Sequence, residues 1–125
     1  MTQRLPPAVV AAIDRSKILG VRAGARSRHR FTGIWAVVVG GRVFARSWSR
    51  TAGGWHATFL EDPLGTLQVG ARHVRVRARR VRSAGIRDAV ERAYAAKYPT
   101  PGSRVYVRGF RSPSRRDTTT EFVPR

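Results

Sequence analysis

Two runs of β-branched and aromatic residues, at positions 34–39 and 43–48, form the most regular hydrophobic pattern in the chain. The pair Gly40-Gly41 stands near the middle of this stretch, between the two runs. A type I′ turn needs a positive φ at both of its central residues, which glycine adopts without strain, so this pair predicts a two-residue β-hairpin. We expect the rest of the chain to be arranged around this hairpin.

The turn also predicts the register of the two strands, because successive side chains of a strand point to opposite faces. With Val39 opposite Arg42, Trp35 falls opposite Arg46. One face then holds Trp35, Val37, Phe44, Arg46 and Trp48, and the other holds Ile34, Ala36, Val38, Val43, Ala45 and Ser47. Three polar residues and all three tryptophans gather at the open end of the hairpin, where we expect the functional site. They are Arg46, Ser47, Arg50, Trp35, Trp48 and Trp55.

Further short strands are predicted where apolar residues alternate between turns rich in glycine and proline. They cover residues 16–22, 31–39, 55–60, 66–69, 72–82, 104–110 and 118–123. In the longest one, Val74, Val76 and Ala78 share a face, and a β-bulge at Arg79-Arg80 is expected to return Val81 to that face. The opposite face carries His73 and a row of arginines, namely Arg75, Arg77 and Arg79. A solvated strand face is the simpler interpretation of this row, and a nucleic-acid stripe is the alternative.

Two segments have the apolar spacing of helices. Pro6-Pro7 suit the first turn of a short helix within residues 1–15. Apolar residues three and four positions apart predict a second helix over residues 86–98, which Pro99 ends. Residues 111–117 are polar, and we expect a flexible loop there.

This order of elements predicts a single α+β domain over residues 1–125. Closely spaced strands joined by glycine-rich turns favour a small β-barrel of six to eight mostly antiparallel strands over a parallel sheet. We expect this barrel to carry a short N-terminal helix and one late helix. A closed sheet leaves few exposed edges, which suits a highly charged surface.

Composition narrows the class of protein. With 125 residues, of which 42% are hydrophobic, the chain can bury one core. Cysteine is absent and the three histidines lack metal-ligand spacing, so no metal is expected. No window approaches the roughly 18 apolar residues of a membrane span, and the N-terminus lacks the pattern of a signal peptide. We therefore expect a soluble, cytoplasmic protein.

The formal net charge of +18 indicates an anionic partner. Almost all cations are arginines, which is also what a GC-rich genome produces without any functional cause. An anionic small cofactor needs only a local arginine cluster, since guanidinium binds phosphate through two parallel hydrogen bonds. Nucleic acid is a possible partner too, but it is not favoured here.

Several motifs resemble a small bacterial family known only as domain of unknown function 2255. They are a tryptophan before a valine run, GR-x-F-x-RSW, Gly-Gly-Trp, a late helix ending in KY, and a terminal TT-x-x-x-VP. The similarity covers about residues 16–124. The family in turn resembles FMN- and deazaflavin-binding split β-barrels, most of all the deazaflavin-dependent nitroreductases, so the fold class that the resemblance implies is a small split β-barrel.

The resemblance implies an FMN or deazaflavin cofactor, a reductase that uses hydride transfer, and a homodimer. It implies that the cofactor phosphate is held by a basic loop in residues 25–33 and by the loop in residues 46–55, with a tryptophan against the ring system. The implied cofactor-binding residues are Arg26, Ser27, Arg28, Arg30, Ser47, Trp48, Ser49, Arg50 and Trp55.

Each candidate residue also has a structural explanation. The basic loop can be a solvated charge run, Trp48 and Trp55 can be core or rim aromatics, and Arg46 can be a cation–π partner of Trp35. No catalytic residue is predicted, because no carboxylate pair, GxSxG, P-loop or Rossmann fingerprint is present. Whether the protein is an enzyme stays open. A basic nucleic-acid-binding module and a cofactor-free interaction barrel are the alternatives to the flavin-type protein.

Overall fold

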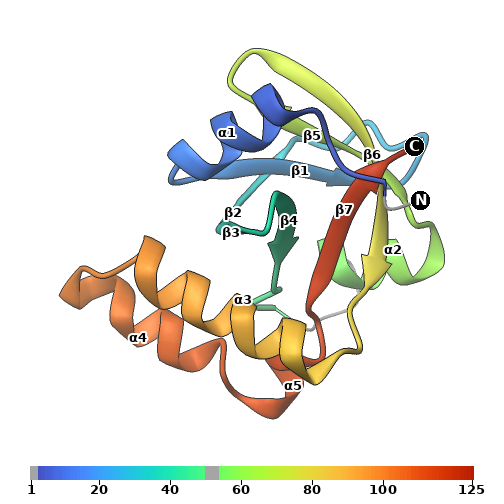
Figure 1. Ribbon diagram of the computed structural model, residues 1–125. Coiled ribbons are helices and arrows are strands. Elements are labelled where there is room, and N and C mark those ends of the chain that lie inside the picture. The colour runs from blue at the N-terminus through green and yellow to red at the C-terminus, as the bar shows by residue number, and fades with distance from the viewer. Residues whose placement is uncertain (1–2, 50–53) are drawn as a thin grey trace.

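The computed structural model describes residues 3–49 and 54–125, and the seven strands within these ranges form one antiparallel sheet (Figure 1). Its strand order is β2-β1-β5-β6-β7-β4-β3. The strands are β1 (Leu19–Ala23), β2 (Thr32–Ile34), β3 (Ala36–Val39), β4 (Arg42–Ala45), β5 (Leu64–Val69), β6 (Arg72–Arg80) and β7 (Thr120–Pro124). The helices of the same ranges are α1 (Pro7–Arg15), α2 (Trp55–Glu61), α3 (Ala84–Lys97), α4 (Pro101–Gly109) and α5 (Pro113–Arg116).

The two outer strands of the sheet, β2 and β3, are consecutive in the chain and are separated only by Trp35. β2 pairs with β1, and β3 pairs with β4. One continuous stretch of chain therefore joins both edges, and the sheet curls into a nearly closed barrel. This confirms the prediction of a small, antiparallel α+β barrel.

The hairpin of β3 and β4 forms as its turn sequence predicts. Gly40 and Gly41 have φ values of 58° and 76°, both in the region that favours glycine. The register places Val39 opposite Arg42 and Val37 opposite Phe44, as expected. The ladder ends at the pair Ala36 and Ala45, so Trp35 and Arg46 lie beyond it.

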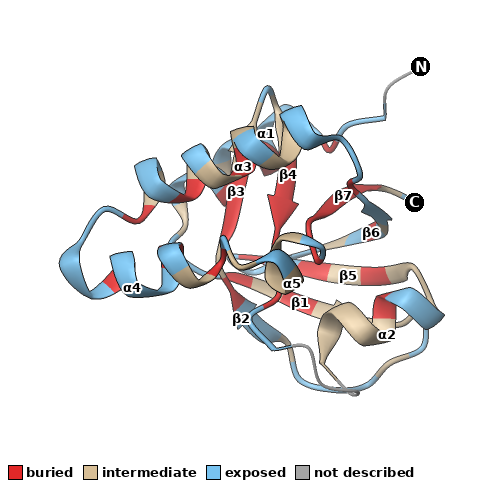
Figure 2. Cartoon of the chain, turned by 90° about the horizontal axis from the view of Figure 1, so that it is seen from below, coloured by how far each residue is buried: buried red, intermediate tan, exposed pale blue. Residues whose placement is uncertain are grey.

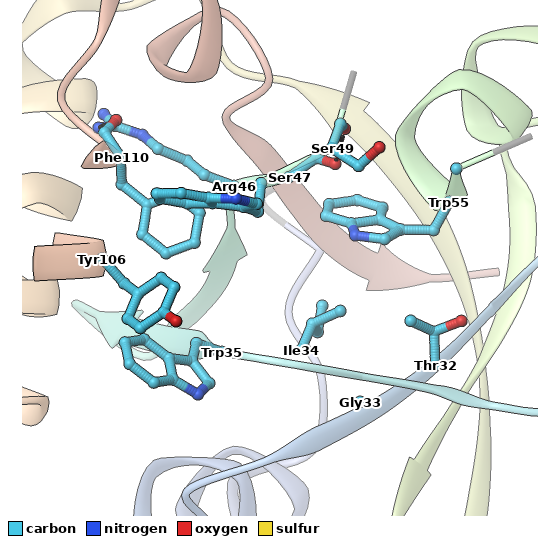
Figure 3. Close-up of a pocket in the computed structure, with 12 residues that line it drawn as sticks. Thr32, Gly33, Ile34, Trp35, Arg46, Ser47, Ser49, Trp55, Tyr106 and Phe110 are labelled. Carbon is cyan, nitrogen blue, oxygen red and sulfur yellow. Dashed lines mark hydrogen bonds between the residues drawn. The ribbon is translucent and has the colours of Figure 1, made fainter. Parts of the chain in front are cut away.

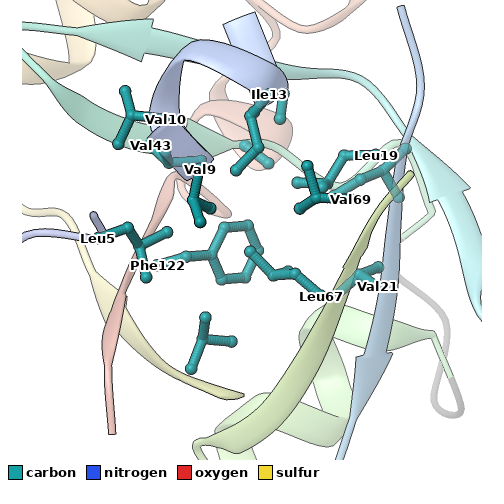
Figure 4. Close-up of a cluster of buried hydrophobic side chains, with 14 of the residues drawn as sticks. Leu5, Val9, Val10, Ile13, Leu19, Val21, Val43, Leu67, Val69 and Phe122 are labelled. Carbon is teal, nitrogen blue, oxygen red and sulfur yellow. The ribbon is translucent and has the colours of Figure 1, made fainter. Parts of the chain in front are cut away.

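The inner face of the hairpin contributes to the barrel interior, which is filled by apolar side chains from every side (Figure 4). Val9 and Ile13 of α1 enter this cluster together with Phe59 of α2. The two helices lie on opposite sides of the barrel in Figures 1 and 2. The N-terminal helix predicted from the prolines is thus confirmed, and its buried stripe helps to fill the barrel.

The outer face of the hairpin is also buried, because α3 and α4 cover it (Figure 2). Val37 and Phe44 pack there against Val90 and Tyr94 of α3 and Phe110 after α4. The alternation of the sequence therefore separates two cores, one inside the barrel and one under the helices. The late helix is confirmed, with Ser83 as its N-cap.

Two predicted strands are helices. Residues 55–60 lie in α2, where Trp55 and Phe59 are four positions apart and turn toward the core while Leu60 stays 66% exposed. Residues 104–110 lie in and directly after α4, which begins at the N-cap Thr100 with Pro101 in its first turn. A short apolar run is compatible with the spacing of a strand or of a helix, and here tertiary packing selects the helix.

Two further expectations concern the strand of residues 72–82 and the segment of residues 111–117. The predicted β-bulge is wrong, because the pairing of β6 with β7 stays regular up to Arg80. Val81 therefore points away from the barrel interior, and it is buried by joining the core under the helices. The segment of residues 111–117, expected as a loop, contains the one-turn helix α5.

Candidate functional site

An aromatic pocket of about 450 Å³ opens where the end of β4 meets α4 and the start of α2 (Figure 3). All three tryptophans of the chain line it, together with Tyr106 and Phe110. Figure 3 shows Trp55 on one side and Trp35 with Tyr106 on the other, with Ile34 and Thr32 along a third wall. We call this hollow the aromatic pocket. It lies at the open end of the hairpin, where the sequence predicts the functional site.

Trp48 forms the exposed rim of the aromatic pocket, with 41% of its surface accessible. Its ring meets those of Tyr106 and Phe110 edge-on, at centroid distances of 5.2 and 5.5 Å. The guanidinium of Arg115 lies 3.8 Å from the Trp48 ring centroid, in a cation–π contact. Tyr106 and Phe110 come from a segment that the sequence predicts as a strand, so they were not recognised as candidates. The capping pattern at the start of α4, Thr100 followed by Pro101, was the available signal.

Arg46 lines the aromatic pocket with its backbone and stem, but its guanidinium extends toward Phe110 and away from the hollow (Figure 3). The side chain is completely buried. Its Nε donates to Thr119, Nη1 donates to Glu91 and to the Phe110 carbonyl, and Nη2 donates to the Arg87 carbonyl, at 2.8–3.1 Å. Burial lowers the pKa of Arg46, although the hydrogen bond and charge of Glu91 act against this. Arg46 is thus a structural link among β4, β7 and the helix layer.

Trp35, the expected cation–π partner of Arg46, stacks instead on Tyr98, with centroids 4.1 Å apart and planes 5° from parallel. Its carbonyl accepts the hydroxyl proton of Tyr94 at 2.6 Å, and the same hydroxyl accepts the backbone N–H of Arg46 at 2.9 Å. Burial raises the pKa of Tyr94 well above its ordinary value, so the proton stays on the hydroxyl. One tyrosine therefore joins the two strand ends that the ladder leaves unpaired.

Ser47 is 1% exposed, and its backbone N–H donates to Thr118 at 2.8 Å. Its hydroxyl donates to the carbonyl of Ser49, which folds the chain back after β4. Ser49 itself is exposed at the edge of the aromatic pocket. Arg50, the remaining candidate of this loop, lies outside the described residues.

The basic loop lines a second, wider hollow of about 990 Å³, next to the aromatic pocket. We call it the basic hollow. Its cations are Arg22, Arg26, Arg28 and Arg30, and its carboxylates are Glu61 and Asp62. Ser27 lines it too, and its Oγ accepts the backbone N–H of His29 at 3.2 Å. Thr32 and Trp55 line both hollows, so the two are contiguous.

The structure thus divides the predicted site residues between two adjoining hollows. Arg26, Ser27, Arg28 and Arg30 line the basic hollow, and Ser47, Trp48 and Ser49 line the aromatic pocket. Among the candidates that the structure describes, only Trp55 borders both. A ligand that used both groups of residues would have to span the boundary at Thr32 and Trp55.

Asp62 anchors the basic loop, a role that sequence analysis did not assign. Its carboxylate accepts the backbone N–H of Ala25 at 2.8 Å and that of Leu64 at 3.1 Å. These two bonds, the first being the stronger cause, lower the pKa of Asp62 below its ordinary value of 3.8. The loop therefore begins at a fixed point on the turn that follows α2.

We expect the side-chain carboxyl of Asp62 to titrate below 3.8 in an NMR titration of its carboxyl carbon. Because the folded-state pKa is depressed, the stabilising effect is complete above the unfolded value and is lost as the pH falls through the folded value. Asp62→Asn should therefore increase hydrogen exchange at the Ala25 amide at neutral pH. Glu61→Gln, on the exposed neighbouring carboxylate, is the matched control and should leave that amide unchanged. An Asp62 midpoint at or above 3.8 would contradict this role.

Within the described ranges, no three His, Cys, Asp or Glu side chains gather as metal ligands do. A search of those same ranges also finds no helix with the length and hydropathy needed to cross a membrane.

The fold and the two hollows define a small antiparallel β-barrel with an aromatic and cationic surface site. The chain belongs to a family described as an uncharacterized protein conserved in bacteria (DUF2255), whose sequence profile matches residues 8–122. This confirms the resemblance to domain of unknown function 2255. No curated protein matches the chain in sequence.

The fold is similar to that of the conserved hypothetical protein Rv2991 from Mycobacterium tuberculosis, whose crystal structure aligns with a TM-score of 0.60. The alignment covers 98% of this chain and 83% of that one, at 13% sequence identity. At this identity the similarity concerns the fold alone.

Proposed function

We propose that this barrel binds FMN or a deazaflavin coenzyme and acts as a reductase. The observation that supports the proposal is the junction of the aromatic pocket and the basic hollow at Thr32 and Trp55. Both cofactors combine a planar ring system with an anionic phosphate chain. The aromatic pocket suits the ring system, and the basic hollow suits the phosphate.

The residues of the aromatic pocket fit a planar ring system. Its volume of about 450 Å³ lies within the roughly 300–1,000 Å³ typical of small-molecule sites. Trp48 and Trp55 line it with flat aromatic surfaces, against which another ring packs favourably in an offset or edge-on arrangement. Tyr106 and Phe110 extend the apolar lining and reduce access of water.

The residues of the basic hollow fit a phosphate. Arg26, Arg28 and Arg30 are exposed, and four arginines face two carboxylates, one of which already accepts two backbone hydrogen bonds. Guanidinium groups bind phosphate through charge-assisted, paired hydrogen bonds. In the proposed complex these arginines hold the phosphate.

A bound flavin or deazaflavin supplies hydride transfer, and the protein supplies binding, orientation and electrostatics. In this chain, Trp48 and Trp55 orient the ring system and the basic loop fixes the opposite end. A substrate would reach the ring system from the open side of the aromatic pocket, next to the exposed rim of Trp48.

Fluorescence titration with FMN, and separately with the deazaflavin coenzyme, tests the proposal directly, because every tryptophan of the chain lines the aromatic pocket. We expect saturable quenching by at least one of the two. The double variant Arg26→Gln/Arg28→Gln should bind that cofactor at least about 10-fold more weakly, since the loss of even one charge-assisted bond costs about 1.5–3 kcal/mol.

Two controls separate phosphate recognition from general effects of charge. Arg92→Gln/Arg108→Gln removes the same net charge from exposed positions on α3 and α4 and should leave binding unchanged. For FMN, riboflavin, which lacks the phosphate, should bind the wild type and the Arg26/Arg28 variant equally. Failure of both cofactors to change the fluorescence would refute the proposal and favour a cofactor-free interaction barrel.

A further inference from the structure

The outer face of β6 presents a row of basic side chains, one histidine and three arginines, to solvent. His73, Arg75, Arg77 and Arg79 alternate with the inward-facing residues of the strand, and all four are exposed. Alternate side chains on a strand are about 6.8 Å apart. The row therefore extends for roughly 20 Å along the barrel.

None of these four side chains forms an ion pair in the described part of the chain. The carboxylates that form ion pairs there are Asp88, Glu91, Asp117 and Glu121, and their partners are Arg42, Arg46, Arg87 and Arg116. In Figure 1 the helices α3 and α4 lie on the far side of the barrel from the β5–β6 hairpin. Glu121 lies opposite Arg79 in the ladder of β6 and β7, but both of its carboxylate oxygens are bonded to Arg42. The arginines of the row therefore remain without an ion-pair partner among the described residues.

An aromatic group lies beside the cationic row on the same face. The ring of Phe31 is 5.0 Å from that of His73, and the guanidinium of Arg22 lies 4.5 Å from the Phe31 centroid. Gly20 makes room for this arrangement, since a Cβ there would lie 2.9 Å from the Cβ of Gln68 and 3.3 Å from that of Phe31. The face thus combines planar side chains with a line of positive charge.

We propose that the outer face of β1, β5 and β6 binds single-stranded nucleic acid. The phosphates lie along Arg75, Arg77 and Arg79, and a base stacks at the cluster of Phe31, His73 and Arg22. Single strands are bound in this way by proteins that place aromatic side chains beside a cationic groove. An unpaired base can stack on these planar groups, whereas the bases of a duplex are already stacked on one another. This face is separate from the aromatic pocket and shares only Arg22 with the lining of the basic hollow, among the described residues. The inference does not depend on cofactor binding.

Fluorescence anisotropy of a labelled 20-nucleotide oligothymidine, measured between 50 and 300 mM NaCl, tests this surface. Three phosphate contacts, at Arg75, Arg77 and Arg79, contribute about −2.1 to the slope of log K against log salt, because each contact on a single strand contributes about −0.7. The triple variant Arg75→Gln/Arg77→Gln/Arg79→Gln should bring the slope about 2 units closer to zero. Arg92→Gln/Arg104→Gln/Arg108→Gln, on α3 and α4, removes the same net charge and should keep the wild-type slope.

The stacking part of the proposal has its own readout. Phe31→Ala should weaken binding at least fivefold with an unchanged salt slope, because base stacking contributes about 1–3 kcal/mol and involves no counterions. Equal losses in the two triple variants would show that net charge alone drives binding and would overturn the proposal. Equal affinity for a duplex of the same length, or for vesicles of anionic lipid, would overturn the assignment to single strands.

Discussion

Replacing Arg46 with alanine is expected to lower the free energy of unfolding by about 3–5 kcal/mol. The substitution leaves the carbonyls of Arg87 and Phe110 without their donor and opens a cavity at a completely buried position. Glu91 keeps a partner, because Arg116 donates to it at 2.7 Å, so the loss comes mainly from the carbonyls and the cavity.

Thermal unfolding followed by circular dichroism measures this loss, which corresponds to a fall in Tm of about 11–19 °C for a chain of this size. Arg46→Lys should recover less than half of it, since an ammonium on a flexible stem cannot reproduce the planar fork. Arg92→Ala, an exposed arginine on α3, should change Tm by less than 2 °C. A free energy within 1 kcal/mol of wild type for Arg46→Ala would contradict the linking role of this side chain.

Replacing Gly65 with alanine is expected to destabilise the barrel by about 2–3 kcal/mol. Gly65 is paired on both sides within the sheet, with Ala23 of β1 and Val76 of β6. A Cβ at this position would lie 2.6 Å from the carbonyl oxygen of Arg22 and 2.6 Å from Cε1 of Phe59. The first atom is backbone and cannot rotate away, so β1 and β5 must separate locally.

Urea unfolding of Gly65→Ala should show a lower midpoint with an unchanged m-value. Gly102→Ala on α4 is the matched control, because nothing lies within 4 Å of a Cβ there and alanine favours the helix. That control should be neutral or slightly stabilising. An unchanged midpoint for Gly65→Ala would show that the sheet yields at this position without loss of stability.

The hairpin was predictable because its turn and its alternation are both local. Gly40-Gly41 determine the turn, and the period of two then assigns each side chain to a face. The sequence did not show that both faces are buried, since an apolar face looks the same whether it meets a barrel interior or a helix. Val81 illustrates the point, because it was assigned to the wrong core.

The helices α2 and α4 were predicted as strands. An apolar run of six or seven residues is too short to distinguish the strand period of 2 residues from the helix period of 3.6. The capping pattern of Thr100 and Pro101 was the local signal for α4. This error had a functional consequence, because Tyr106 and Phe110 were left out of the site that they line.

For the site, the sequence predicted the gathering of the tryptophans at the open end of the hairpin, since Trp35 and Trp48 follow from the strand register. It placed the arginines of residues 25–30 beside this end but could not resolve the two hollows. Their separation depends on where α2 lies and on the bond from Ala25 to Asp62, which is 37 residues away in the chain.

By itself, the sequence determined the hairpin, its register, the late helix and the excess of positive charge, because these depend on neighbouring residues or on composition. Only the tertiary structure decided that Arg46 is buried and links the end of β4 to the helix layer. It also decided that the aromatic and basic residues line adjoining hollows. Within the described ranges, it showed that Arg75, Arg77 and Arg79 of β6 form no ion pair. The physical reason is that burial, desolvation and ion pairing arise between segments far apart in the chain, and these contacts exist only once the barrel has closed.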